Sequence, residues 1–252
     1  MSEPPRALGQ GSPRGWAGDE ASRGAAVRSM FAAVAPRYDL LNHVLSLGCD
    51  IAWRRATARA LREILKRPGS CVADLCCGTG DLTLCLRRES SGLVVGVDFC
   101  HPMLRLARRK AGTGGGHIHF LEADALSLPF RDDSLDVVAV AFGFRNLANY
   151  DRGVEEMRRV LKRGGCLAIL EFSRVQGRVF GPVFRFYFLR VLPRLGTWIS
   201  GVSGPYRYLP NSVSVFPDQD ALAETIRAAG FRNVSYGNFT GGVAALHLGE
   251  KA

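Results

Sequence analysis

Short apolar segments alternate with helical segments through most of this chain, and this alternation limits the fold more than any other feature. Five apolar segments have the length of β-strands, and three segments near them have helical character. The predicted strands are residues 71–76, 93–98, 118–124, 135–142 and 166–172, and the predicted helices are 81–88, 102–110 and 150–162. Strands separated by helices are typical of a parallel sheet with helices on both faces.

The C-terminal part adds a helix at residues 218–229 and strands at 234–239 and 242–249. Only a short turn separates the last two strands, whereas a parallel crossover needs about a dozen residues. We therefore expect the final strand to be antiparallel. The predicted fold is α/β, a Rossmann-like doubly wound sheet of seven strands with the last strand antiparallel. This layout is characteristic of class I S-adenosylmethionine-dependent methyltransferases.

The chain divides into a tail and one domain. Residues 1–25, rich in Gly, Pro, Ser and Arg, lack periodicity and are predicted to be a disordered tail. Residues 26–252 form the domain, in which 26–68 is a helical extension. Asp50 is expected to cap the last helix of that extension. Residues 174–214 interrupt the strand–helix alternation and are predicted to be an insertion or lid.

Charge and cysteine content exclude several classes of protein. The chain has 33 basic and 23 acidic residues, and a net charge of +10 attracts nucleic acid or an anionic membrane surface. The basic residues do not cluster and no aromatic-rich RNA motif is present, so no nucleic-acid partner is expected. Seven cysteines without a C-x-x-C pair indicate neither a disulfide framework nor a metal site, and they fit a reducing cytoplasm.

No signal peptide or transmembrane helix is predicted. The N-terminus lacks an apolar core, and arginines and prolines interrupt the most apolar tract, residues 179–202. We therefore expect a cytoplasmic protein.

The stretch "ADLCCGTGDL" at residues 73–82 is predicted to be a cofactor-binding loop. Gly78 and Gly80 follow the first strand directly and open a helix, where the backbone must turn sharply and approach a ligand. Asp98 ends the second strand, 20 residues beyond Gly78. A carboxylate at that place can accept both ribose hydroxyl protons of a nucleoside cofactor.

A nicotinamide cofactor suits this loop poorly. The third glycine of G-x-G-x-x-G would fall at Thr83, and a helix start that carries Asp81 repels a pyrophosphate. A cofactor with no phosphate and a positive sulfonium suits Asp74 and Asp81 better. We therefore predict S-adenosylmethionine as the cofactor.

The third strand and the adjacent cysteines complete the loop. Asp124 and Ala125 end the third strand, where an adenine amino group can be held; the alternative for Asp124 is to cap a turn. Cys76 and Cys77 lack metal-site spacing and rarely bridge as neighbours, so they are expected to pack beneath the loop.

Several motifs along the chain resemble one family in particular. They occur in order over about residues 27–250 and are "MFAAVAPRYDLLNHVLSLGCDIAWRR", "DLCCGTGDLT", "EADALSLPF", "AFGFRN", "MRRVLKRGGCLAILEFS", "YRYLPNSV", "FPDQ" and "TGGVAALH". Together they are similar to the ubiquinone/menaquinone biosynthesis C-methyltransferase family. The resemblance implies methyl transfer from S-adenosylmethionine to a ring carbon of a polyprenyl quinol, as in conversion of demethylmenaquinol to menaquinol.

The resemblance also implies site residues. Cofactor contacts carry over to Thr79, Asp98, Asp124 and Ala125, and weakly to Ala141, where the family often has serine. Cys76 and Cys77 replace small residues that are common in the family. Because of this difference, the resemblance leaves open whether the substrate ring is a naphthoquinol or a benzoquinol, and whether it carries a phytyl tail.

Carbon methylation needs a ring hydroxyl that loses its proton, and three residues are predicted to serve this chemistry. Arg145 cannot be a free base, but it can stabilise a phenolate or polarise a water that Asn146 orients. Tyr38 is expected to close the pocket and contact the quinol. The alternatives are a loop-holding salt bridge for Arg145 and helix packing for Tyr38. His43, His101 and His247 are further candidate bases.

Residues 178–201 interleave aromatic and aliphatic side chains with Arg185, Arg190 and Arg194. This pattern is typical of an interfacial helix on anionic lipid or of an apolar lid over the quinone, and it predicts transient contact with the inner face of the membrane. The alternative is packing on the sheet edge or on a partner in a homodimer. Other functions considered are a methyltransferase for another lipid and an inactive binding module.

Overall fold

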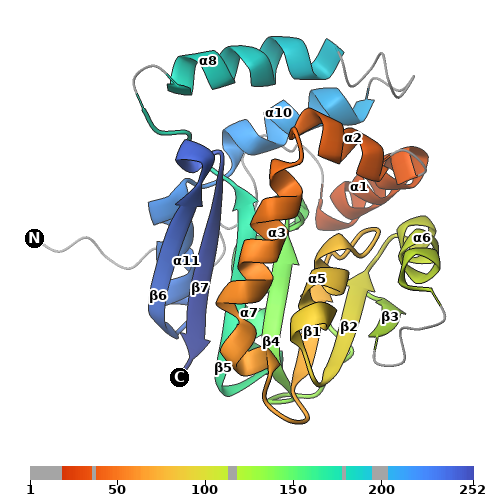
Figure 1. Cartoon of the computed structure of the whole chain (residues 1–252), viewed down its shortest axis with the longest axis vertical. Coiled ribbons are helices and arrows are strands. Elements are labelled where there is room, and N and C mark those ends of the chain that lie inside the picture. The colour runs from red at the N-terminus through yellow and green to blue at the C-terminus, as the bar shows by residue number, and fades with distance from the viewer. Residues whose placement is uncertain (1–18, 36–37, 113–117, 178–179, 195–203) are drawn as a thin grey trace, which may run out of the picture.

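The computed structural model describes residues 19–35, 38–112, 118–177, 180–194 and 204–252. Its centre is a seven-stranded sheet in the order β3-β2-β1-β4-β5-β7-β6 (Figure 1). The first five strands are parallel, and β7 is antiparallel to both of its neighbours, which confirms the predicted fold class. The strands are β1 Cys71–Leu75, β2 Leu93–Asp98, β3 Ile118–Glu122, β4 Leu135–Ala141, β5 Leu161–Phe172, β6 Phe231–Phe239 and β7 Ala244–Lys251.

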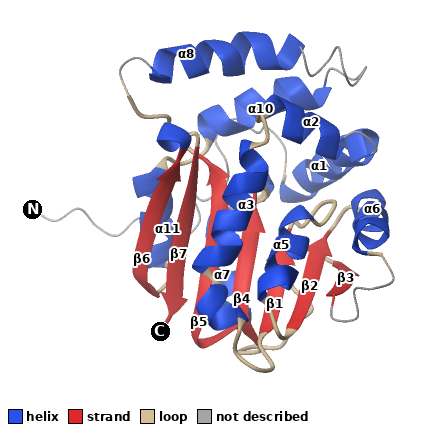
Figure 2. Ribbon diagram, in the orientation of Figure 1, coloured by secondary structure: helices blue, strands red, loops and turns tan. Residues whose placement is uncertain are grey.

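Helices cover both faces of the sheet (Figure 2). Along β4, Val137 and Ala139 pack toward one face while Val138 and Val140 pack toward the other, because successive side chains of a strand alternate. The first face is covered by α3 Cys49–Ala60, α4 Arg62–Leu65 and α5 Asp81–Glu89, and the second by α7 Tyr150–Val160 and α11 Gln219–Ala228. Helix α6, His101–Ala111, packs beside β2 and β3.

A third group of helices lies over the carboxyl ends of the parallel strands, at the top of Figure 1. It consists of α1 Glu20–Val34, α2 Tyr38–Leu45, α8 Phe180–Phe186 and α10 Gly204–Val215, with a π-helical turn at Tyr187–Val191. The predicted extension and the predicted insertion therefore come together over one edge of the sheet. None of the helices in the described ranges is long and apolar enough to span a bilayer.

The N-terminal boundary of the helical extension differs from the prediction. Helix α1 already begins at Glu20, because the Asp19 side chain accepts a hydrogen bond from the Ser22 amide at 2.7 Å and caps the helix. The tail predicted to be disordered up to residue 25 was therefore too long. Residues 1–18 lie outside the described residues.

Other local predictions were also wrong: β3 ends at Glu122, before Asp124, and β6 begins at Phe231 instead of residue 234. Gly48, with φ of 75°, begins α3, and Asp50 lies inside the first turn and binds side chains instead of capping the helix. Strand β5 begins at Leu161 and not at residue 166, because Leu161 already pairs with Leu135 ahead of a register shift.

The C-terminal strand is held by a buried lysine. The Lys251 ammonium donates hydrogen bonds to the carbonyls of Leu161 at 2.6 Å and Arg159 at 3.2 Å, and it pairs with Asp133 at 2.9 Å.

Lys251→Ala removes the donor from these carbonyls, so we expect the free energy of unfolding in urea to fall by about 1–3 kcal/mol. The exposed Lys66→Ala is the control. Equal stability of the two variants would show that the hydrogen bonds of Lys251 do not stabilise the protein.

Candidate active site

A cavity of about 330 Å³ lies where the carboxyl ends of β1, β2 and β4 meet the helical extension. We call it the cofactor cavity. Ten residues predicted for the site line it: Tyr38, Asp74, Gly78, Thr79, Asp81, Asp98, Asp124, Ala125, Ala141 and Asn146. Gly80 and Arg145 do not line it. Gly80, with φ of 84°, makes the turn into α5, and an added Cβ would come within 3.3 Å of the Ala107 Cβ.

Backbone amides hold Asp98 in place beneath the loop. Its two carboxylate oxygens accept hydrogen bonds from the Gly78 and Cys100 amides, both at 2.8 Å. Each oxygen keeps a lone pair with which it can accept a hydroxyl proton. Burial raises the pKa of Asp98 to about 6, against the lowering effect of these amide hydrogen bonds. This geometry suits the predicted ribose contact.

Asp74 is the most deeply buried acid of the cofactor cavity. One carboxylate oxygen accepts a hydrogen bond from the Thr83 hydroxyl at 2.5 Å, and the other has no partner among the described residues. Burial raises the pKa of Asp74 to about 7. An unpaired carboxylate oxygen in a cavity favours a cationic ligand, so this group fits S-adenosylmethionine, whose sulfonium and amino groups are positive.

The rim of the cofactor cavity contains an ion-pair network. The Lys110 ammonium lies 2.6 Å from Asp39 and 2.6 Å from Asp81, and it donates to the Thr79 hydroxyl at 3.1 Å. That hydroxyl in turn donates to Asp39. Lys110 therefore offsets the negative charge of Asp81, which the sequence analysis had matched to the positive sulfonium of the cofactor. The network also ties α2 to the cofactor loop.

Asp124 has a hydrogen-bond partner within the protein, and burial suppresses ionisation of Cys76 and Cys77. The Asp124 carboxylate accepts a hydrogen bond from the Leu126 amide at 2.9 Å, so it caps a turn while lining the cavity. Burial raises the pKa values of Cys76 and Cys77 well above the ordinary range, with neighbouring carboxylates adding to the effect. Such thiols are unreactive, consistent with packing beneath the loop.

A second cavity, of about 320 Å³, lies between the helical extension and the residues predicted as a lid. We call it the aromatic cavity. Its apolar walls include Trp53, Phe172, Phe180, Phe184, Tyr187 and Phe188. Four residues line both cavities: Phe31, Tyr38, Arg54 and Phe142. The two cavities therefore meet at this border.

Arg145 lines the aromatic cavity, and other residues of the protein hold its guanidinium in place. Its guanidinium pairs with the buried Glu171 at 2.8 Å, donates to the Phe142 carbonyl and lies over the Phe172 ring at 5.3 Å from the centroid. Burial would lower the pKa of Arg145, but the charge and the hydrogen bond of Glu171 act against burial, and the pKa is raised overall. The salt bridge considered for Arg145 is therefore present, and Nε has no partner among the described residues.

Asn146 and Tyr38 connect the two cavities. The Asn146 side-chain oxygen accepts a hydrogen bond from the Tyr208 hydroxyl at 2.9 Å, and Tyr208 lines the aromatic cavity. Tyr38 packs edge-on against Phe31, with 5.8 Å between centroids. Burial raises the pKa of Tyr38, although Arg145 and Arg54 act in the opposite direction. Tyr38 thus presents a neutral hydroxyl at the border.

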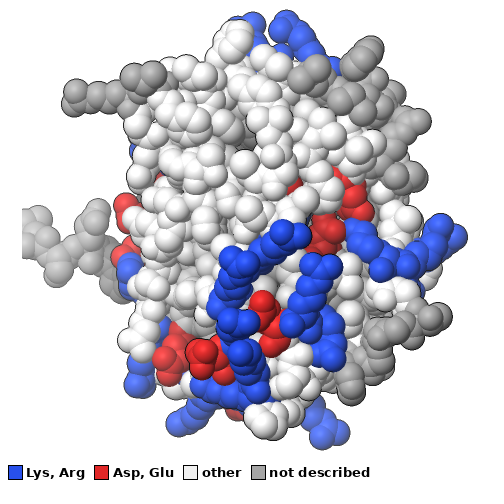
Figure 3. Space-filling model, viewed as in Figure 1, with Lys and Arg blue, Asp and Glu red and all other residues white. Residues whose placement is uncertain are grey.

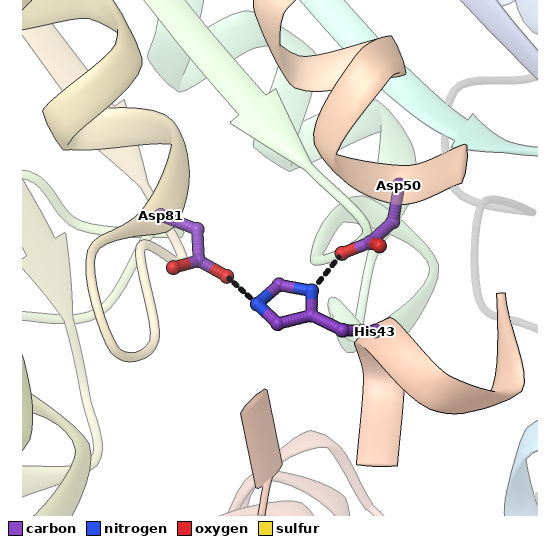
Figure 4. Close-up of side chains that lie close together, drawn as sticks. All are labelled: His43, Asp50 and Asp81. Atoms are coloured by element: carbon purple, nitrogen blue, oxygen red, sulfur yellow. Dashed lines mark hydrogen bonds and ion pairs between the residues drawn. The ribbon is translucent and has the colours of Figure 1, made fainter. Parts of the chain in front are cut away.

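Sequence reasoning missed Arg54 and its pairing with Asp50. The Arg54 guanidinium is buried, pairs with Asp50 and lies over the Phe142 ring at 5.1 Å from the centroid. Asp50 also accepts a hydrogen bond from Nδ1 of His43 at 2.9 Å (Figure 4). The only signal in the sequence is an Asp–Arg pair four residues apart on a helix, a spacing common on exposed helices.

Comparisons with known proteins agree with this geometry. A structure of an S-adenosylmethionine-dependent methyltransferase from Aquifex aeolicus has a TM-score of 0.57 and 20% identity over 78% of this chain and 89% of that chain. A phosphoethanolamine N-methyltransferase from Haemonchus contortus, solved with S-adenosylhomocysteine, also has a TM-score of 0.57, with 14% identity over 78% of this chain and 52% of that one. These likenesses concern the fold alone.

Relatives in sequence are closer. Demethylmenaquinone methyltransferase of Thermus thermophilus is 52% identical over 88% of this chain and 100% of its own length. That of Deinococcus radiodurans is 49% identical over 93% and 96%. Ubiquinone/menaquinone biosynthesis C-methyltransferase UbiE of Geotalea daltonii is 41% identical over 91% and 97%.

The sheet order and the acidic cofactor cavity define an S-adenosylmethionine-dependent methyltransferase. The profile of the ubiE/COQ5 methyltransferase family matches residues 19–251. The chain belongs to this family, which confirms the resemblance found in the sequence.

The raised pKa of Asp98 gives a prediction for cofactor binding. Ribose hydroxyls donate to the ionised carboxylate, so affinity for S-adenosylhomocysteine should fall as the pH drops through about 6. Asp98→Asn should bind about 10-fold or more weakly at pH 7.5, because it loses charge-assisted hydrogen bonds, and should lose less affinity on acidification. Calorimetric titrations at several pH values measure both effects. An unchanged pH dependence in Asp98→Asn would contradict the assignment.

Proposed function

We propose that this protein transfers a methyl group from S-adenosylmethionine to a ring carbon of a prenylated quinol, with demethylmenaquinol as the substrate. The observation that carries the proposal is the junction of an acidic cavity and an aromatic cavity at Tyr38, Arg54 and Phe142. A donor in one cavity and a flat apolar ring in the other would meet at this border. The names of the relatives from Thermus thermophilus and Deinococcus radiodurans support the naphthoquinol ring.

In this proposal the acids of the cofactor cavity hold the donor. Asp98 accepts hydrogen bonds from the ribose hydroxyls, and the unpaired oxygen of Asp74 attracts the positive end of the molecule. Asp124 and Ala125 lie beside the adenine ring. S-adenosylmethionine supplies a methyl group activated by the positive sulfur to which it is bonded. The two buried carboxylates also select against a phosphate-bearing cofactor, since like charges repel in a site of low dielectric.

Residues of the aromatic cavity bind and activate the ring. Phe142 and Phe172 offer aromatic faces against which a naphthoquinol can pack. Arg145 and Arg54 each lie beside this cavity with a buried acid partner, so their charges are fixed in position before the substrate binds. A fixed cation near a ring hydroxyl stabilises the phenolate that makes the ring carbon nucleophilic. Tyr38 closes the border and contacts the quinol, and Asn146, from the side of the cofactor cavity, orients a water that Arg145 polarises.

A benzoquinol is the second candidate ring. The UbiE relatives carry the ubiquinone pathway in their names, and the smaller ring would fit the same cavity. The tail would leave through the outer wall of the aromatic cavity, to which Phe180, Phe184 and Leu47 contribute.

We further propose that this outer wall docks on a membrane. Six apolar side chains here are 47–87% exposed. Leu40 and Val44 lie on α2 and Leu47 just after it, and Val183, Phe186 and Leu189 lie in residues 180–194, which we call the α8 segment. Arg185, Arg190 and Arg194 are exposed on the α8 segment. Apolar side chains among arginines suit a surface of anionic lipid, from which a prenylated quinol could pass into the cavity. Figure 3 shows few acidic side chains over this end of the visible face, in keeping with such a contact.

The function is tested with purified protein, labelled S-adenosylmethionine and demethylmenaquinol in detergent. The wild type should produce labelled menaquinol. Leu209→Trp fills the aromatic cavity, so it should lose at least 10-fold in turnover and keep its affinity for S-adenosylhomocysteine. Val215→Trp is the matched control on the same helix, because Val215 is exposed and lies outside both cavities.

Absence of labelled menaquinol from the wild-type reaction would contradict the proposed substrate. If the label appears in a benzoquinol product alone, the second ring is the substrate.

Membrane docking is tested by co-sedimentation with vesicles. The wild type should sediment with vesicles containing about 30% anionic lipid at low salt, and added salt should weaken the binding because it screens the arginines. The double variant Val183→Glu/Phe186→Glu should stay in the supernatant, whereas Leu93→Glu, at the opposite end of the sheet, should sediment like the wild type. Wild-type protein that remains in the supernatant at low salt would rule out the docking surface.

A further inference from the structure

The side-chain amide of Asn146 lies between the two cavities, and its oxygen is already bound. Asn146 ends the 3-10 turn Phe144–Asn146, which follows β4, and it lines the cofactor cavity. Its Oδ1 accepts a hydrogen bond from the Tyr208 hydroxyl of α10 at 2.9 Å, and Tyr208 lines the aromatic cavity. This hydrogen bond therefore joins the wall of one cavity to the wall of the other.

Arg23 of α1 holds the Tyr208 hydroxyl from a third element. Its guanidinium is buried, makes a hydrogen bond to the Tyr208 side chain and donates to the Arg145 carbonyl at 3.3 Å. Helices α1 and α10 contact each other, which brings both side chains to the turn that contains Asn146. The sequence had placed Arg23 in the tail predicted to be disordered, so this contact could not be predicted.

The chemistry of these three side chains fixes the direction of each hydrogen bond. A guanidinium has only donors, so the Tyr208 oxygen accepts from Arg23. The phenol proton then needs an acceptor, which the Asn146 oxygen provides. An amide turned the other way would face the phenol with its nitrogen and leave that proton without an acceptor. The oxygen of Asn146 is thus held at Tyr208, and its two N–H donors are left for a ligand.

Tyr208 is a neutral phenol among three charged groups. Burial raises its pKa, Arg145 and Arg23 act in the opposite direction, and Glu171 of β5 adds to the rise. A neutral phenol keeps the proton that the Asn146 oxygen accepts. The hydrogen bond from the Arg23 cation also polarises the phenol and strengthens its own donation.

None of the histidines in the described ranges lines either cavity. His43 is paired with Asp50, the side chain of His101 is 57% exposed, and Nε2 of His247 is 2.9 Å from the Gln219 carbonyl. The histidines considered as bases are therefore away from the border. The polar groups that can act on the ring there include the donors of Arg145, Tyr38 and Asn146.

We propose that the hydrogen bonds from Arg23 to Tyr208 and from Tyr208 to Asn146 position the Asn146 amide for methyl transfer, with its nitrogen donating to the water beside the reacting ring oxygen. The inference rests on the proposed function, because it requires the quinol ring at the border. A water that accepts hydrogen bonds from Asn146 and Arg145 turns its own proton toward the ring oxygen and stabilises the phenolate. Tyr208 and Arg23 are positioning residues, since they act through Asn146.

Tyr208→Phe removes the hydroxyl and keeps the ring. With labelled S-adenosylmethionine and demethylmenaquinol, kcat should fall about 10-fold or more, because a misplaced group at the reacting centre is costly. Affinity for S-adenosylhomocysteine should stay unchanged. A less stabilised phenolate forms at higher pH, so the rising limb of the kcat profile should move to higher pH. Tyr236→Phe, which removes a hydroxyl that donates to Asp220 at 2.7 Å outside both cavities, is the matched control.

Two further comparisons distinguish positioning from a merely structural role. In an Asn146→Ala background, Tyr208→Phe should cause no further loss of kcat, because its effect passes through Asn146. Arg23→Met should lower kcat as Tyr208→Phe does, and Arg23→Lys, which keeps a donor, should restore most of it. Wild-type kcat in Tyr208→Phe, or an equal loss with and without Asn146, would overturn the inference.

Nuclear magnetic resonance tests the orientation of the amide without a quinol. In the complex of isotope-labelled protein with S-adenosylhomocysteine, the side-chain N–H signals of Asn146 are those that disappear in Asn146→Ala. They should shift in Tyr208→Phe and keep their positions in Tyr236→Phe, and unshifted signals in Tyr208→Phe would overturn the inference. If wild-type protein does not methylate demethylmenaquinol, the proposed substrate fails, and this measurement still reports on the positioning of Asn146.

Discussion

Charged side chains buried at the carboxyl edge of the sheet must find partners, and these pairings fix the side chains that line the two cavities. An unpaired buried charge costs several kcal/mol, so each such group acts as a strong positional constraint. Asp98 is held by two backbone amides of the loops after β1 and β2. Arg145 is held by Glu171 at the end of β5, and Arg54 by Asp50 within α3. Among the buried carboxylates in the described part of the chain, only Asp74 keeps an oxygen without a partner, at the place where the cofactor is expected.

The helical extension and the α8–α10 region complete this edge. Without them the cofactor cavity would lose Phe31, Tyr38 and Arg54 from its walls. Residues from α1, α2 and α3 form one side of the aromatic cavity, and residues from α8 and α10 form the other. Arg54 and Tyr38 stand where the cavities meet. The same segments expose the apolar side chains proposed to touch lipid, so one part of the chain would both collect a prenylated ring and present it to the donor.

The sequence predicts the features that depend on local pattern. Gly78 directly after an apolar strand, with Asp98 at the end of the next, was enough to predict that the two residues lie at one cavity, because strand ends of a parallel sheet share one edge. The short turn before β7 was enough to predict its direction. The aromatic cavity could not be predicted in this way. Its walls come from residues far apart in the chain, and no periodicity reports that Leu47 and Val243 face one space.

Arg54 and Asp50 illustrate the same limit. Four residues apart on a helix, they look like an ordinary surface ion pair, and Asp50 looks like a helix cap. Only the packing of α3 against the sheet shows that both are buried beside the cavities. Arg145 was predicted as a site residue from the family motif, but its salt bridge to Glu171 depends on a strand 26 residues further along the chain.

The central claim is that the two cavities hold donor and ring on either side of a border formed by Phe31, Tyr38, Arg54 and Phe142. A crystal structure with S-adenosylhomocysteine and a redox-stable naphthol analogue tests it most directly. The account predicts the nucleoside against Asp98, the sulfur at the border, and the aromatic ring packed between Phe142 and Phe172. A ring bound outside the aromatic cavity, or a sulfur that points away from the border, would contradict it.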